Sequence, residues 1–292
     1  MRLRSSILIG LCVLLTTNVC LAKNDAANVF ARGEMLLQSG DFSGALKVLT
    51  KAAKLAPNNE AYRREATLVR RVIQIRSRHD KIEDTERWTM MAKALHTFYH
   101  DRKVYTAALD LDTRAHAKLG TDDSAVMLAS TQLALDMNED AATMLGGLDK
   151  DKSTPHTRAL LGIALARQGK IDKAKALLEP FKAPEKHAAE LALDFARLRA
   201  LVRDDSGTIQ MLKQYFELTP PSRLEKARTA ARECTDLKRL AETEAFAAAL
   251  KTDSKVKESS CSGGTSCGSC PNRSSCSSAS KDADKDKKPE QP

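Results

Sequence analysis

Aromatic side chains are scarce in this chain: Phe, Trp and Tyr together make up only 4% of its 292 residues. A β-sandwich would need more aromatic and β-branched residues, so the scarcity argues against an all-β protein. Apolar runs long enough to cross a membrane are missing after residue 22, which excludes a polytopic membrane protein. The rest of the composition, 42% hydrophobic and 29% charged, excludes a wholly disordered chain and favours a soluble helical protein built on Ala and Leu.

Recognisable catalytic signatures are also missing from the sequence. It contains no nucleophile elbow, no phosphate-binding loop and no zinc-protease motif. We therefore expect that the protein is not an enzyme and that its helical part holds no cofactor.

Residues 1–22 have the layout of a secretory signal peptide. Two arginines form a basic start, residues 7–15 form an apolar stretch, and Ala22 ends a cleavage site. An uncleaved anchor is the alternative, while residues 18–19 do not fit a lipoprotein signal. We expect an exported protein, periplasmic if the host is a diderm bacterium and otherwise secreted, in a space where thiols tend to pair. After cleavage it would not span a membrane, although contact with a membrane surface stays open.

A pattern of small residues and turn residues marks the start of the mature chain. In residues 40–59, Gly40 ends one helix, Ala45 is the small residue of a helix contact, and Pro57 closes the next helix. Counting back, Gly33 falls where two helices cross closely. This segment resembles the tetratricopeptide repeat (TPR) family, whose period is about 34 residues.

The small residue of the second helix recurs at an almost constant step. It stands at Ala108, Ala141 and Ala174 and is replaced by Thr208 in the last copy, which matches the family period of about 34 residues. The step from Ala45 to Ala108 is nearly twice as long and leaves room for one degenerate copy that contains a long helix over 59–79. The resemblance implies an all-α, TPR-like α-solenoid of about five to six helix pairs, with an unrelated helical bundle as the alternative.

The sequence thus divides into a signal peptide over 1–22, a helical repeat domain over 23–252 and a tail over 253–292. Residues 221–252 are strongly helical and more charged than the repeats. We expect them to form a final helix pair, because the last repeat of a solenoid needs a polar cap.

The resemblance also implies a concave groove, lined by the first helix of each pair, in which a protein or peptide binds. At any single position the alternative is that the side chain packs against a neighbouring helix. The positions that face this groove in the family are Phe30, Glu34, Leu37, Ile163, Arg167, Leu193 and Arg197. Phe30, Glu34 and Leu37 replace the Lys, Asn and Arg with which some TPR co-chaperones grip a C-terminal carboxylate, so that role is unsupported.

Two further clusters in the helical part invite a functional interpretation. His96 and His100 are four positions apart, which places both imidazoles on one helix face, but no third metal ligand is evident nearby. A packed or surface histidine pair is therefore favoured over a metal site. Residues 63–79 hold six arginines, which form the solvated face of a long helix or touch an anionic lipid or an acidic partner. Because the protein is expected to be exported, we expect no nucleic acid partner.

The tail carries four cysteines in the pattern C-x5-C-x2-C-x5-C, namely Cys261, Cys267, Cys270 and Cys276. Its Ser-rich surroundings cannot bury a core, so we expect a flexible extension. The four thiols either form disulfides, which the oxidising compartment favours, or enclose Zn, Cu or an Fe–S cluster, or act as a redox dithiol. Cys234 is left over and is expected to be a buried thiol.

Taken together, these features predict an exported TPR scaffold or adaptor that binds a protein or peptide partner in envelope assembly or maintenance. The alternative is a metal-binding or thiol-redox protein that acts through the tail cysteines.

Overall fold

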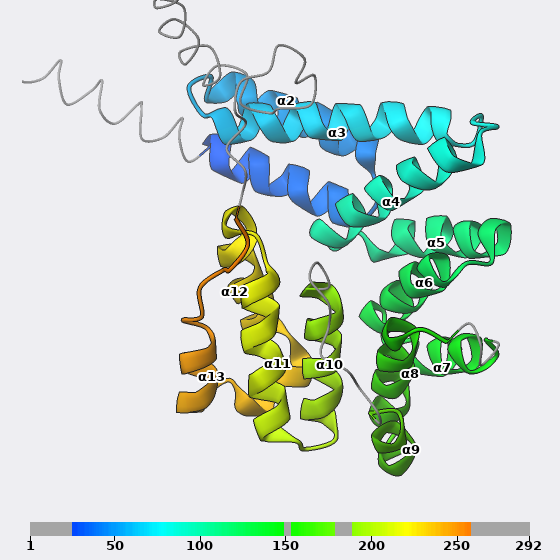
Figure 1. The fold of residues 1–292 in the computed structure, drawn as a ribbon. Helices are drawn as coiled ribbons and strands as arrows, with labels where there is room; N and C mark the ends of the chain where they lie inside the picture. Colours follow the sequence, from blue (N-terminus) through cyan, green and yellow to red (C-terminus); the bar gives the residue numbers. More distant parts are fainter. Residues whose placement is uncertain (1–24, 149–152, 179–188, 258–292) are drawn as a thin grey trace, which may run out of the picture. The chain divides into compact units, whose positions relative to one another are not determined.

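The computed structural model describes residues 25–148, 153–178 and 189–257, and every regular element within these ranges is a helix. The protein is therefore all-α in the part that is described (Figure 1). None of the helices in these ranges is long and apolar enough to cross a membrane. The chain divides between Phe181 and Lys182 into two compact units.

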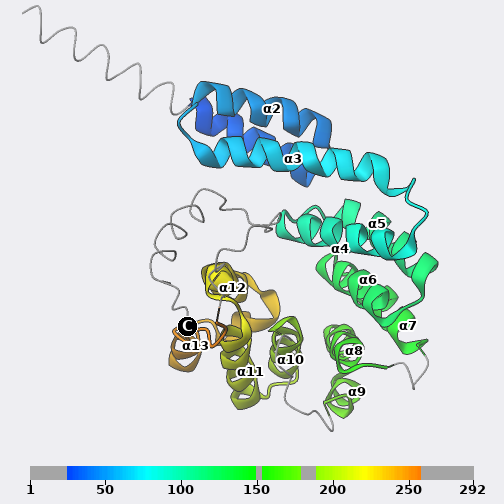
Figure 2. The same ribbon diagram turned by 45° about the horizontal axis from the view of Figure 1, so that its top comes forward.

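The first unit begins with a helix over residues 25–38. It continues with α2 (Phe42–Leu55), α3 (Glu60–His79), α4 (Thr85–Asp101), α5 (Tyr105–Leu119), α6 (Asp122–Ala134), α7 (Asn138–Gly146), α8 (Pro155–Arg167) and α9 (Ile171–Ala176). Each of these helices packs mainly on its neighbours in the chain, as Figures 1 and 2 both show.

Polar side chains fix where several of these helices begin. Asp84 Oδ1 accepts a hydrogen bond of 2.7 Å from the backbone N–H of Arg87 at the start of α4. Thr154 caps α8 in the same manner, with Pro155 as the first helical residue. Such caps satisfy backbone N–H groups that have no partner inside the helix, typically stabilising it by about 1 kcal/mol.

One turn recurs throughout the described chain. It joins the two helices of each pair, and its central residue has a φ between 55° and 83° at Gly40, Lys103, Asp136, Gly169 and Arg203. In every copy the N–H of that residue donates to the carbonyl three positions back, and the next N–H donates to the carbonyl five positions back. Three of the five residues are not glycine, although this backbone region favours glycine.

From Lys103 onward the turns recur at an almost constant step, close to the TPR period of about 34 residues. The small residues of the second helices recur at the same step. The interval from Gly40 to Lys103 is nearly twice as long, because it holds one helix more than the others, the lone α3. The expectation of a degenerate copy is therefore wrong in its detail: a single helix of 20 residues, starting at the Asn59 cap, takes the place of a pair.

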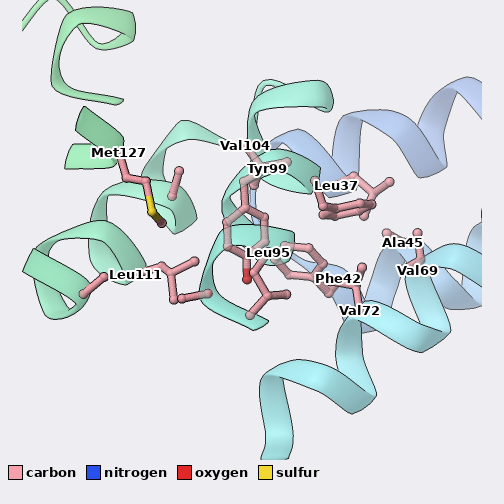
Figure 3. Packing of buried hydrophobic residues seen from close by; sticks show 14 of the residues in the cluster. Leu37, Phe42, Ala45, Val69, Val72, Leu95, Tyr99, Val104, Leu111 and Met127 are labelled. Atoms are coloured by element: carbon pink, nitrogen blue, oxygen red, sulfur yellow. The ribbon is translucent and has the colours of Figure 1, made fainter. Parts of the chain in front are cut away.

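The core of the first unit lies between the 25–38 helix and α2 to α6. Figure 3 shows Phe42 at its centre among side chains from α2, α3 and α4, with the ring centroid of Tyr99 5.8 Å from that of Phe42. Trp88 is also buried, stacked on His79 with 4.4 Å between ring centroids. Helices α3 and α4 are thus joined by the side chains that they both contribute to this core.

The second unit contains α10 (Ala189–Leu201), α11 (Asp205–Leu218), the 3₁₀ helix η2 (Pro221–Arg223), α12 (Leu224–Glu233), the 3₁₀ helix η3 (Thr235–Leu240) and α13 (Glu244–Ala249). Its core is built on Phe195, Phe216 and Phe246, each at most 1% exposed. The expectation of a final helix pair over 221–252 is met only in part: the segment forms two short helices, α12 and α13, which are separated by η3 and both pack on α11.

Candidate functional site

The neighbouring helices α2 and α3 of the first unit carry a groove that is lined by cations. Lys47, Lys51 and Lys54 line it from α2, and Arg70 and Arg76 line it from α3. We call this surface the basic groove. All five side chains are exposed, and α2 and α3 pack directly on each other.

The groove consists of two cavities that share Ser43 in their linings. The first is a cavity of about 750 Å³ with an aromatic floor, where the Arg76 guanidinium lies 4.1 Å from the centroid of the Phe42 ring. Burial raises the pKa of Tyr99 in this floor, so its hydroxyl stays protonated at physiological pH. Phe42 and Tyr99 are at most 3% exposed, so the accessible lining of this cavity is largely polar.

The second cavity measures about 470 Å³ and is lined by the apolar side chain of Leu46 as well as by cations. The three lysines and Arg70 line it, and no carboxylate does. Residues three or four apart share one face of a helix, which is why the lysines of α2 all reach this cavity.

Acidic residues at the end of the first cavity are already engaged. Asp80 and Asp110 both pair with Arg114, at 2.6 and 3.0 Å. In contrast, no carboxylate of the described residues lies within ion-pair distance of any of the five groove cations. Arg76, Arg114, Asp80 and Asp110 cancel one another in the first cavity, so the excess positive charge of the groove comes from Lys47, Lys51, Lys54 and Arg70 of the second cavity.

The residues that the TPR resemblance assigns to a concave groove have mixed positions in the first unit. Phe30 is half-buried, and its ring stacks on that of Tyr62 with 4.3 Å between the ring centroids. Glu34 is exposed. Leu37 and Ile163 are at most 1% exposed, so their side chains pack in the core and offer no surface to a partner. Arg167 is used to donate to the Leu133 carbonyl at 2.7 Å.

In the second unit, the two remaining positions lie on α10. Leu193 is half-buried. Arg197 pairs with Asp194 at 2.7 Å and with Asp236 at 2.9 Å, which joins α10 to η3. These ion pairs outweigh the effect of burial and raise the pKa of Arg197. Arg197 is therefore part of the packing of this unit.

His96 and His100 form a polar cluster with Asp112 and Thr131, a connection that the sequence did not reveal. His96 Nδ1 donates to Asp112 Oδ2 at 2.9 Å, and Thr131 Oγ1 donates to the same oxygen at 2.6 Å. His100 Nε2 lies 2.7 Å from Thr131 Oγ1. Burial, assisted by the neighbouring His96, lowers the pKa of His100 to about 4, so this imidazole is neutral at physiological pH.

Of the cysteines, the structure places only Cys234, a half-buried free thiol whose pKa is raised by burial. The tail cysteines Cys261, Cys267, Cys270 and Cys276 and the signal peptide over 1–22 lie outside the described residues. The disulfide, metal and redox interpretations of the tail accordingly stay predictions.

Two of the five cations of the basic groove, Arg70 and Arg76, belong to a stretch that the sequence analysis singled out. The density of arginines in residues 63–79 was a clear signal, but the solvated-face interpretation gave no role to the lysines of α2. Those lysines recur at 47, 51 and 54, the spacing of one helix face, and that spacing together with an arginine-rich neighbouring helix is the pattern that predicts such a groove.

Comparison with known protein families gives no match to this chain, and comparison with curated proteins finds none that is similar to it. The function is therefore inferred from the geometry of the chain itself.

Proposed function

We propose that this protein is an exported, TPR-like adaptor, and that its basic groove binds an acidic segment of a partner protein. The observation that carries the proposal is the set of five exposed cations on α2 and α3, none of which is in an ion pair with a carboxylate of the described residues.

The repeated turn supports the TPR-like part of the proposal. Five turns with the same hydrogen bonds join the helices of successive pairs, and after the first pair their step is close to the TPR period of about 34 residues. Stacks of such pairs form α-solenoids, and α-solenoids serve chiefly as surfaces on which other proteins bind. Within each unit, the described pairs are consistent with this architecture.

The groove chemistry supports an acidic segment as the ligand. Asp or Glu side chains of a partner would place carboxylates near Arg70 and Arg76, whose guanidinium groups bind carboxylates through two parallel hydrogen bonds. Because the lysines and arginines are exposed, the charge contribution should be strong at low salt and weaken as salt is added.

A peptide selection tests the proposal. A phage-displayed library of random peptides is selected on the full chain, and the dissociation constants of the selected peptides are measured by fluorescence anisotropy. The triple variant K51E/R70E/R76E reverses the charge of three groove cations. The matched control K173E/K175E/K213E makes the same change in net charge at exposed lysines outside the groove.

We expect selected peptides rich in Asp and Glu, binding at least about 10-fold more weakly to the groove variant and within about 2-fold to the control. Equal binding to wild type and groove variant, or peptides with no excess of acidic residues, would reject the groove as the site. A parallel measurement uses vesicles with anionic phospholipid: vesicle binding without peptide binding would replace the protein partner by a membrane surface.

Export is a separate part of the proposal and has its own test. Intact-mass measurement of the protein purified from its native cells should give a chain that begins at Lys23 if the predicted signal peptide is removed. A mass that includes residues 1–22 would contradict removal of the signal.

A further inference from the structure

The contact between α4 and α5 differs from the corresponding contact in every other helix pair. In the other pairs joined by the recurring turn, the first helix has a Gly or Ala at one position, and a Leu stands 16 residues later. That Leu lies in the second helix or directly after it. These residues are Gly33 and Leu49, Ala129 and Leu145, Gly162 and Leu178, and Ala196 and Leu212. In the α4–α5 pair, the same two positions hold His96 and Asp112.

The apolar version of this contact is tight. A Cβ placed on Gly33 would lie 2.7 Å from side-chain carbons of Leu49, closer than real carbon atoms approach. In the α4–α5 pair, the apolar contact is replaced by a hydrogen bond of 2.9 Å between the His96 imidazole and the Asp112 carboxylate. Burying a carboxylate at a helix contact is costly unless its oxygens are bonded, so this substitution needs a compensating role.

The carboxylate is only partly compensated by its neighbours. Asp112 is fully buried, and Oδ2 receives the hydrogen bonds of His96 and Thr131. Oδ1 has no hydrogen-bond partner among the described residues. A buried carboxylate oxygen without a donor costs free energy, and a bound cation would supply the interaction that it lacks.

The surrounding side chains offer the donor set of a metal site. One nitrogen each of His96 and His100 and one carboxylate oxygen of Asp112 lie within 4.8 Å of one another. The two imidazoles already face each other on α4, with ring centroids 4.2 Å apart. Metal–ligand bonds of about 2.0–2.1 Å in a tetrahedral site require donor atoms about 3.4 Å apart, so small side-chain rotations complete the geometry.

We propose that His96, His100 and Asp112 form a binding site for a divalent transition-metal ion, with Zn²⁺ as its best-matched ligand. Two imidazoles and one carboxylate suit Zn²⁺ or Fe²⁺, whereas Ca²⁺ and Mg²⁺ prefer oxygen ligands alone. The ion would supply the positive charge that the buried carboxylate lacks. His96 is 17% exposed, which leaves one side of the site open to solvent and to a fourth ligand.

Zinc titration of the full chain tests this site. The four tail cysteines are also candidate ligands, so the parent protein carries C261S, C267S, C270S and C276S. After metal removal, Zn²⁺ binding is measured by isothermal titration calorimetry, and Co²⁺ binding by visible absorption, which reports tetrahedral coordination.

Two variants of this parent distinguish the site from other histidines. H96A/D112L gives α4 and α5 the residues found at the same positions of α10–α11, so it is expected to fold. H116Q removes a histidine of α5 that contacts Ser124 and lies outside the cluster. Circular dichroism verifies the fold of both, and H100Q replaces H96A/D112L if that variant does not fold.

We expect one Zn²⁺ per parent chain, with an affinity lower by on the order of 100-fold or more in H96A/D112L and unchanged within about 2-fold in H116Q. Saturating Zn²⁺ should raise the Tm of the parent but not of H96A/D112L. Absence of Zn²⁺ binding in the parent, or equal binding in H96A/D112L, would overturn the proposal and leave the cluster as a hydrogen-bonded contact only. The outcome does not depend on the partner-binding test.

Discussion

The α4–α5 and α10–α11 pairs have polar side chains in one case and apolar side chains in the other at the equivalent positions of their helix contact. In α10–α11 the contact is made by Ala196 and Leu212, both 0% exposed. In α4–α5 it is made by His96 and the fully buried Asp112, held by a third polar residue, Thr131 of α6. The turn that joins the helices is the same in both pairs. The backbone of a helix pair is therefore compatible with either contact, and the difference resides in whether polar side chains find partners.

The largest loss of stability should come from placing the buried carboxylate of the α4–α5 pair at the corresponding position of the α10–α11 pair. Leu212→Asp buries a carboxylate with no histidine to pair with among residues 189–257, and the hydroxyl of Thr208, one turn away, already donates to the Asp204 carbonyl. The change should destabilise the second unit by about 4 kcal/mol or more. Urea denaturation followed by circular dichroism measures the loss. A midpoint close to that of wild type would contradict the claim that the polar contact needs its specific partners.

Breaking the polar contact on one side should be nearly as harmful. His96→Ala removes one of the two donors to Asp112 Oδ2 and should cost about 3 kcal/mol, because it leaves a buried carboxylate with a single partner. The double variant H96A/D112L removes the charge as well and should lie within about 1 kcal/mol of wild type. A double-mutant cycle measures the coupling; simple additivity of the two changes would show that the residues act independently.

A buried histidine outside the polar contact gives a pH test. Burial lowers the pKa of His79, although the Trp88 carbonyl, 3.1 Å from Nε2, and Asp80 act in the opposite direction, and Arg114 and Lys118 act with burial. The unfolded chain therefore takes up this proton before the native chain does. Stability from His79 is present above the unfolded pKa of about 6.5 and is lost as the pH falls through it toward the lower native value.

His79→Gln keeps a donor for the Trp88 carbonyl but does not titrate. Between pH 7 and pH 5, its free energy of unfolding should fall by less than that of wild type, as measured by urea denaturation at both pH values. Equal losses in the two proteins would show that His79 binds its proton equally well in both states.

The smallest effects concern the shared turn. Arg203 holds a left-handed backbone of φ 65° where two other pairs use glycine. Arg203→Gly should stabilise the protein by about 0.5–1 kcal/mol, since a side chain in this region is strained. Gly40→Ala should destabilise it by a similar amount, because no atom lies near a Cβ there and only conformation changes. Chemical denaturation of both variants checks the opposite signs.

The helix pairs could be predicted from the sequence because their contacts and turns involve residues close along the chain. The sequence alone predicted the small residues of the second helices at 108, 141 and 174. It also predicted the long helix over 59–79. The degenerate copy expected around that helix does not form, because α3 extends over 20 residues and α4 begins only a short loop later, at Thr85.

The site residues were harder to predict, because each depends on which helices become neighbours. Asp112 is a partner of His96 only through the packing of α5 on α4, and Thr131 reaches it from α6. For the same reason, Leu37 and Ile163 were expected in a groove but lie in the core: a helix position indicates a face, and the neighbours decide how deeply that face is buried.

The turn that recurs at Lys103, Asp136 and Gly169 also constrains how such a chain can evolve. Its hydrogen bonds run between backbone groups, so they do not depend on which side chains surround them. An in-frame duplication or deletion of the stretch between two such turns would join one copy of the turn to another with every donor and acceptor in place. A whole helix pair could thus be gained or lost in a single genetic event. The joined chain would keep the complete set of backbone hydrogen bonds of the turn.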